Sequence, residues 1–113
     1  MNRIAGWFFA AIALLTAGAI RTRAEVLVPT GATWRYFKGT TPPSSPDPTV
    51  WRNPEFPDDS WASGVATFYY GDPFTGTELN DMQNSYSSVF LRREFSIANP
   101  ADVQSLTLTA ACD

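Results

Sequence analysis

Hydrophobic and polar positions alternate in several short runs along the chain beyond residue 24. The runs predict five strands, at residues 25–28, 33–38, 65–70, 88–97 and 103–110. β-branched and aromatic residues, which suit the pleated surface of a sheet, are frequent in these runs. Turn-forming residues separate them, and a long loop at residues 75–87 carries at most one helical turn, around residues 78–83. The pattern therefore predicts an all-β fold.

The run at residues 88–97 is the clearest strand. One face carries Val89, Leu91, Arg93, Phe95 and Ile97, and the other carries Phe90, Arg92, Glu94 and Ser96. Arg93 interrupts the apolar face, and a buried guanidinium group needs a carboxylate or several carbonyls as partners. We therefore predict that Arg93 forms an ion pair with Asp58 or Asp59. The alternative is an arginine at the rim of the sheet whose charged end reaches water.

A turn-rich segment at residues 51–61, called here the aromatic turn, contains two tryptophans, a phenylalanine and two adjacent aspartates. Its two prolines disfavour a helix, and Pro57-Asp58-Asp59-Ser60 is typical of a turn. The three large aromatic residues are poorly suited to water, so we predict that they fold back over one end of the core. The alternative is a platform on which a sugar stacks. Residues 62–64 are predicted to form a further turn.

Residues 39–49 contain four prolines and no large apolar residue. This composition predicts an exposed loop with polyproline-like stretches and no apolar anchor. We favour a tolerated surface insertion, with a recognition loop as the alternative.

Residues 1–24 have the pattern of a signal peptide. Arg3 provides a positive start, residues 4–20 are uncharged and mostly apolar, and Thr22-Arg23-Ala24 offers small residues at the cleavage positions. An uncleaved membrane anchor is the alternative, but the run is weakly apolar and shorter than the ~20 residues that a spanning helix prefers. We therefore expect a secreted or cell-surface protein, with residues 25–113 as its mature part and no membrane attachment after cleavage.

Cleavage after Ala24 leaves 89 residues with five basic and eleven acidic side chains, a formal charge of −6. That charge argues against nucleic acid or an anionic membrane surface as a partner. The sequence contains no histidine and a single cysteine, Cys112. It therefore predicts no internal disulfide, no zinc site of the cysteine–histidine type, and no Ser-His-Asp or Cys-His catalytic centre within these residues.

The carboxylates offer little further chemistry. A glycosidase needs two carboxylates that face each other across a cleft, and the acids of the aromatic turn are better explained as turn residues. Several aspartates offer oxygen ligands, but without EF-hand spacing. We predict no catalytic residue, no metal site and no cofactor, with a structural calcium ion as the alternative. The aromatic residues with the best case for stacking on a sugar ring are Trp51, Trp61, Tyr69 and Tyr70.

Five short strands separated by turns predict an antiparallel β-sandwich. A mature chain of 89 residues would bury about 60–65% of its surface on folding, which is a modest share. Because a sandwich needs further strands to close its two sheets, we expect the domain to be incomplete at its C-terminal end. The strand at residues 103–110 would then expose an unpaired edge.

The order of several motifs resembles a known family. The chain is similar to the galactose-binding-like jelly-roll module of large secreted bacterial proteins in these residues and segments: Trp34-Arg35-Tyr36-Phe37-Lys38-Gly39, Trp51, Phe56-Pro57-Asp58-Asp59-Ser60-Trp61-Ala62-Ser63-Gly64, Tyr70-Gly71, Val89-Phe90-Leu91-Arg92-Arg93-Glu94-Phe95 and Leu106-Thr107-Leu108. The segment from Phe56 to Trp61 is also similar to sugar-binding domains of glycoside hydrolases. The resemblance covers about residues 26–113 and implies a jelly-roll β-sandwich.

The resemblance also implies a function, although one fold supports many functions. It implies a non-catalytic module of a secreted or cell-surface protein that binds carbohydrate or packs against neighbouring domains of the same protein. One alternative is the accessory N-terminal domain of a secreted glycoside hydrolase or metallophosphoesterase, with a catalytic domain beyond residue 113. The other alternative is a structural spacer.

Overall fold

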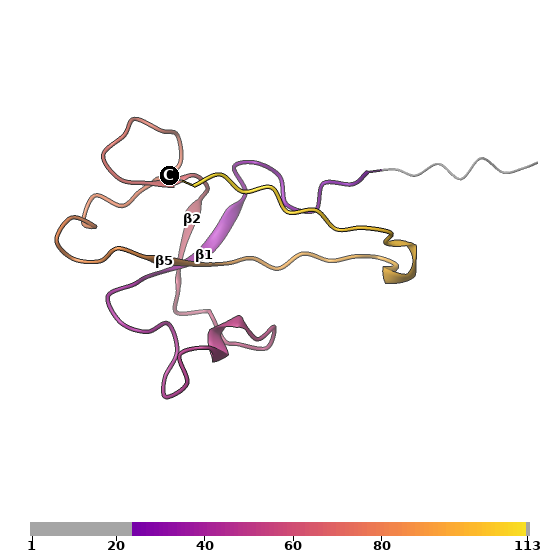
Figure 1. Ribbon diagram of the computed structural model, residues 1–113, viewed down its shortest axis with the longest axis horizontal. Coiled ribbons are helices and arrows are strands. Elements are labelled where there is room, and N and C mark those ends of the chain that lie inside the picture. The colour runs from indigo at the N-terminus through magenta and orange to yellow at the C-terminus, as the bar shows by residue number, and fades with distance from the viewer. Residues whose placement is uncertain (1–23, 113) are drawn as a thin grey trace, which may run out of the picture.

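The computed structural model describes residues 24–112. These residues form a small all-β fold with two single turns of 3-10 helix (Figure 1). The elements in chain order are β1 (Thr33–Lys38), η1 (Val50–Arg52), β2 (Ala62–Val65), β3 (Phe68–Tyr69), β4 (Thr77–Glu78), β5 (Val89–Arg92) and η2 (Pro100–Asp102). No helix among these residues is long and apolar enough to cross a membrane. The predicted signal peptide lies outside the described residues, which begin at Ala24.

The main sheet has three antiparallel strands in the order β2-β1-β5. The central strand, β1, has the bounds predicted from its alternating pattern. Arg35 of β1 lies opposite Ser63 on one side and opposite Arg92 on the other, and Phe37 lies opposite Phe90. A second, two-stranded sheet pairs β3 with β4 in parallel.

The aromatic turn covers one face of the main sheet, as its composition predicts. Trp61 is only 6% exposed, and its ring centroid lies 5.4 Å from that of Phe37 and 5.8 Å from that of Phe56. Trp51 meets Phe90 of β5 edge-on, with 5.2 Å between the ring centroids. Rings in these tilted and edge-on geometries attract one another beyond the burial of their area. The aromatic turn is therefore the core of this side of the fold.

The second sheet and the loop after it cover the opposite face. The ring of Tyr36 in β1 lies 5.2 Å from that of Phe68 in β3. Lys38 forms an ion pair of 2.6 Å with Asp81, whose other carboxylate oxygen accepts a 2.7 Å hydrogen bond from the Tyr86 hydroxyl. Burial of Tyr86 raises the pKa of its hydroxyl, and the hydrogen bond to Asp81 raises it further, to about 12. These contacts attach the loop to the central strand.

Residues 62–70 differ from prediction. Residues 62–64 form part of β2 rather than a turn, and the single strand predicted at residues 65–70 divides between β2 and the short β3. Gly64 explains why this small-residue run can lie in the sheet. A Cβ atom at Gly64 would lie 2.5 Å from the Thr77 hydroxyl and 3.0 Å from the Phe68 ring, so only glycine allows the second sheet to approach this closely.

The strands predicted at both ends of the described chain are also absent. Residues 25–28 form no strand, and the strand predicted at residues 88–97 is limited to Val89–Arg92. Residues 103–110 have no strand pairing within the described part of the chain, and Leu106 and Leu108 are 64% and 86% exposed. Alternation alone does not form a strand, because the backbone needs a neighbouring strand to pair with. Residues 93–112 instead form a long arm that reverses direction at η2 (Figure 1).

The proline-rich loop at residues 39–49 is more tightly held than predicted. Pro43 is buried, so the loop does have an apolar anchor. Ser44 donates a 2.6 Å hydrogen bond to the carbonyl of Asp47, and the Asp47 side chain accepts one of 2.8 Å from the backbone N–H of Thr49. Hydrogen bonds from the hydroxyl and backbone of Thr49 lower the pKa of Asp47. Its own side chains therefore fix the shape of this loop.

Candidate functional site

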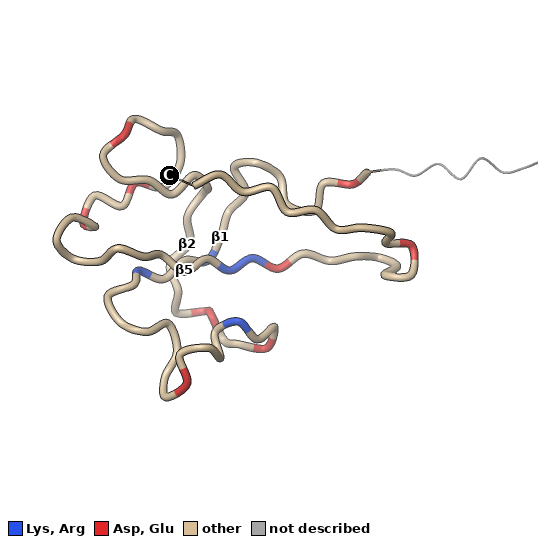
Figure 2. Tube along the Cα trace, viewed as in Figure 1, with Lys and Arg blue, Asp and Glu red and all other residues tan. Residues whose placement is uncertain are grey.

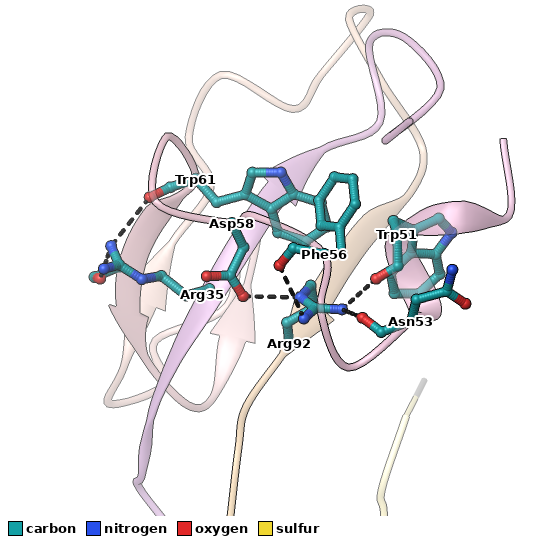
Figure 3. Close-up of polar contacts among 8 residues, drawn as sticks. Arg35, Trp51, Asn53, Phe56, Asp58, Trp61 and Arg92 are labelled. Carbon is teal, nitrogen blue, oxygen red and sulfur yellow. Dashed lines mark hydrogen bonds and ion pairs between the residues drawn. The ribbon is translucent and has the colours of Figure 1, made fainter. Parts of the chain in front are cut away.

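Arg92 holds the aromatic turn against the sheet (Figure 3). Its Nε atom lies 2.8 Å from the carboxylate of Asp58, and its two Nη atoms donate hydrogen bonds to the carbonyls of Trp51, of Asn53 at 3.1 Å and of Phe56 at 3.4 Å. The guanidinium carbon also lies 5.3 Å from the centre of the Phe56 ring. The Arg92 side chain is only 9% exposed, and that of Asp58 is 22% exposed. A planar group with five donors suits this convergence of carbonyls and carboxylate.

The ion pair predicted for Arg93 is therefore formed by its neighbour. Arg93 is exposed and donates a hydrogen bond to the carbonyl of Thr33, and Asp59 has no ion-pair partner among residues 24–112. The reason is the side-chain alternation of β5. Arg92 shares its face with Phe90, which is the face that the aromatic turn covers, whereas Arg93 does not.

Arg35 lies directly opposite Arg92 in the neighbouring strand. Two like charges opposite each other in a sheet repel, so each needs its own partners. Arg35 donates through one Nη atom to the carbonyl of Trp61 at 3.3 Å and to the hydroxyl of Ser63 at 3.1 Å (Figure 3). The aromatic turn is thus tied to the sheet by two arginines, one near each of its ends.

Two adjoining depressions lie beside this structure. The first has a volume of about 760 Å³ and the second about 520 Å³, and both are open to solvent. They share four lining residues: Trp34, Arg92, Arg93 and Glu94. The two depressions adjoin at these shared residues and are together called here the Trp34 groove. Arg92 ends β5, and Figure 2 shows the chain there as a short basic segment followed at once by an acidic one, which are Arg92, Arg93 and Glu94 in the sequence.

Polar groups with unused hydrogen-bonding capacity line the Trp34 groove. Arg93 uses one Nη atom on a backbone carbonyl, which leaves its other donors available. Glu55 and Glu94 are exposed and form no ion pair within the described part of the chain. Beside them the half-buried Trp34 presents an aromatic surface. The groove therefore combines an aromatic surface, hydrogen-bond donors and hydrogen-bond acceptors.

Of the four predicted sugar-stacking residues, Trp51 and Trp61 lie together, with 6.2 Å between their ring centroids, whereas Tyr69 and Tyr70 lie elsewhere. Trp51 lines the first depression, although its ring also packs on Phe90. Trp61 is buried inside the aromatic cluster, where no ring face is free for a sugar. Tyr69 packs against Phe74 with 6.0 Å between ring centroids, and Tyr70 is 42% exposed on the same strand end. Neither tyrosine lines the groove.

Sequence reasoning missed Trp34 as a candidate. Trp34 lies in the alternating pattern of β1, which predicts a half-buried strand, and its side chain is half-buried in the structure. The sequence carries no clear signal for this role, because most of the other residues that line the depressions beside Trp34 come from the aromatic turn and from the segment at residues 91–95, which are distant from it along the chain.

No group of three or more potential metal ligands lies among residues 24–112, and Cys112 is an exposed free thiol. Comparison of the chain with known protein families, with curated proteins and with solved structures found no match. The resemblance to galactose-binding-like modules therefore rests on the motifs in the sequence.

Proposed function

We propose that this chain is a non-catalytic, carbohydrate-binding module of a secreted or cell-surface protein, and that its ligand lies in the Trp34 groove. The observation that carries the proposal is the combination in that groove of an aromatic surface, a guanidinium group with donors to spare, and carboxylates without an ion-pair partner among the described residues. A signal-peptide pattern at residues 1–24 supports export.

The chemistry of a sugar fits this lining. A pyranose ring has an apolar C–H face that stacks on an aromatic ring, and hydroxyl groups around its edge that both donate and accept hydrogen bonds. Arginine only donates and an ionised carboxylate only accepts, so a groove that offers both satisfies both roles of a hydroxyl. Trp34 offers the aromatic surface, Arg93 the donors and Glu94 the acceptors.

We also propose that the domain is a β-sandwich of the jelly-roll type. The main sheet already has apolar cover on both faces, from the aromatic turn and from the β3–β4 sheet. The motif order that resembles the galactose-binding-like family supports the same architecture. A sandwich would give the arm, residues 93–112, a sheet to join.

The experiment is affinity electrophoresis of the protein in gels that contain neutral polysaccharides, namely β-glucan, xylan, galactan and mannan. Retardation by at least one of them is expected. Trp34→Ala should abolish the retardation because it removes the stacking surface, whereas Tyr70→Ala, an exposed aromatic outside the groove, should leave it unchanged. If none of these polysaccharides retards the intact protein, the proposal is wrong.

A second candidate function is packing against a neighbouring domain of the same protein. The arm favours it, because Phe95, Leu106 and Leu108 are 47%, 64% and 86% exposed. Exposed apolar residues on an unpaired extended segment are a ready surface for another polypeptide. Leu106→Lys with Leu108→Lys should then weaken association with such a domain while sugar binding persists. Both sugar binding and domain packing are compatible with the alternative that this chain is the accessory domain of a secreted hydrolase. Each would be useful to a catalytic domain in the same protein.

A further inference from the structure

We infer that the Trp34 groove binds the interior of a sugar chain, with at least two consecutive sugar units seated side by side, rather than a single sugar. The inference rests on the proposed carbohydrate function. It comes from the division of the groove into two depressions that adjoin at Trp34.

The dimensions of the groove support two subsites. Sites for small ligands have volumes of about 300–1,000 Å³. The two depressions, of about 760 Å³ and 520 Å³, each fall within that range on their own. Because they share Trp34, Arg93 and Glu94, a ligand of two or more sugar units can contact both depressions at once. A single sugar would fill only part of their combined volume.

The polar lining repeats along the groove. The first depression has its own acceptor and donor, Glu55 and Arg52, and the second has the acceptor Asp59. Arg93 and Glu94 lie in the part that both depressions share. Glu55, Asp59 and Glu94 are all exposed, and none has an ion-pair partner among the described residues. Hydrogen-bonding groups are thus available at each end and in the middle, as a ligand with hydroxyl groups along its whole length requires.

Neither depression is enclosed, so the structure has no wall that would stop a chain at either end. A site that recognises a chain terminus surrounds the last sugar unit, whereas an open groove lets the chain continue on both sides. The openness of the Trp34 groove therefore favours interior units over chain ends.

The test is calorimetric titration with an oligosaccharide series, from monosaccharide to hexasaccharide, made from whichever of the four polysaccharides retards the protein. Affinity should rise about tenfold or more from the monosaccharide to the trisaccharide, and then level off once both depressions are filled. Conversion of the reducing-end sugar of the hexasaccharide to its alditol should leave the affinity unchanged.

Two variants assign the subsites. Glu55→Gln alters only the first depression and Asp59→Asn only the second, so each should weaken binding of the longer oligosaccharides severalfold. Asp72→Asn, an exposed acid outside the groove, is the matched control and should have no effect. All three replaced carboxylates are exposed, and unchanged thermal unfolding would verify that each variant is folded.

The outcomes separate this inference from the proposed function. A monosaccharide that binds as tightly as the hexasaccharide, or a loss in only one of the two groove variants, would overturn the two-subsite groove and leave carbohydrate binding intact. Failure of every polysaccharide to retard the protein would overturn the proposed function, and this inference with it.

Discussion

Replacement of Arg92 by alanine tests whether one side chain holds the aromatic turn to the sheet. Arg92 donates hydrogen bonds to three backbone carbonyls and forms an ion pair with Asp58 at 2.8 Å, in a site where its own side chain is 9% exposed. In Arg92→Ala, the three carbonyls and the Asp58 carboxylate all lose the side chain that donates to them. The aromatic turn, which includes the buried Trp61, would then be held by ring packing and by the hydrogen bond from Arg35 to the Trp61 carbonyl.

The size of the effect follows from the burial of the pair. Breaking a fully buried ion pair costs about 3–5 kcal/mol, and a surface pair contributes about 0.2–1 kcal/mol. With Asp58 at 22% exposure, water reaches part of the abandoned carboxylate and lowers the cost. We therefore expect Arg92→Ala to reduce the free energy of unfolding by about 2–4 kcal/mol, a large share of the about 5–15 kcal/mol that stabilises a typical domain.

Urea unfolding followed by tryptophan fluorescence measures this change, since three of the tryptophans lie in or beside the affected region. The adjacent Arg93→Ala is the matched control, because it removes an exposed arginine with one carbonyl contact and should cost about 0.5 kcal/mol or less. Arg92→Lys should fall between the two, because lysine keeps the charge but not the fork of donors. Equal losses in Arg92→Ala and Arg93→Ala would refute the reasoning.

Three further predictions concern stability. Trp61→Ala should reduce the free energy of unfolding by about 3–5 kcal/mol, measured by urea denaturation, because it empties the centre of the aromatic cluster. The hydrogen bond from Lys38 lowers the pKa of Asp81 below its ordinary value of 3.8, so the ion pair stabilises the fold above that pH and is lost as the pH falls. Asp81→Asn should therefore flatten the acid limb of a stability-against-pH curve, and an unchanged limb would contradict the assignment. Gly39→Ala should destabilise by about 1–3 kcal/mol in thermal unfolding, because its Cβ would lie 2.7 Å from the carbonyl oxygen of Ser88.

The sequence predicted the parts of the fold that local pattern determines. The strand at residues 33–38 has the predicted bounds because its aromatic and β-branched residues favour a strand and both of its neighbours are present. The aromatic turn was recognised because its prolines exclude a helix and its rings are poorly suited to water. Both features depend on residues close together in the chain.

The prediction was wrong where structure depends on distant partners. The pattern at residues 103–110 is as regular as that of β1, but no strand among the described residues pairs with it. Residues 62–64 read as a turn because Ala-Ser-Gly is small and polar, whereas the close approach of Thr77 makes Gly64 suitable for a strand. Trp34 was missed as a candidate for a related reason, since the depressions that it lines are formed with residues distant in the chain.

The choice between the two adjacent arginines shows the same limit most sharply. The alternating pattern places Val89, Leu91 and Phe95 on one apolar face of the predicted strand. Arg93 interrupts that face, so the pattern predicts that Arg93 needs a partner. In the structure that face is not the buried one, since Leu91 and Phe95 are 38% and 47% exposed. The aromatic turn packs on the alternate face, so the arginine on that face becomes the buried one and receives the carbonyls and Asp58. Arg93 lies on the other face and keeps most of its donors. The alternation that assigns the structural role to Arg92 therefore leaves Arg93 for the sugar contact that we propose. The two alanine variants should then differ: Arg92→Ala should lower the free energy of unfolding, and Arg93→Ala should lower the affinity for the sugar.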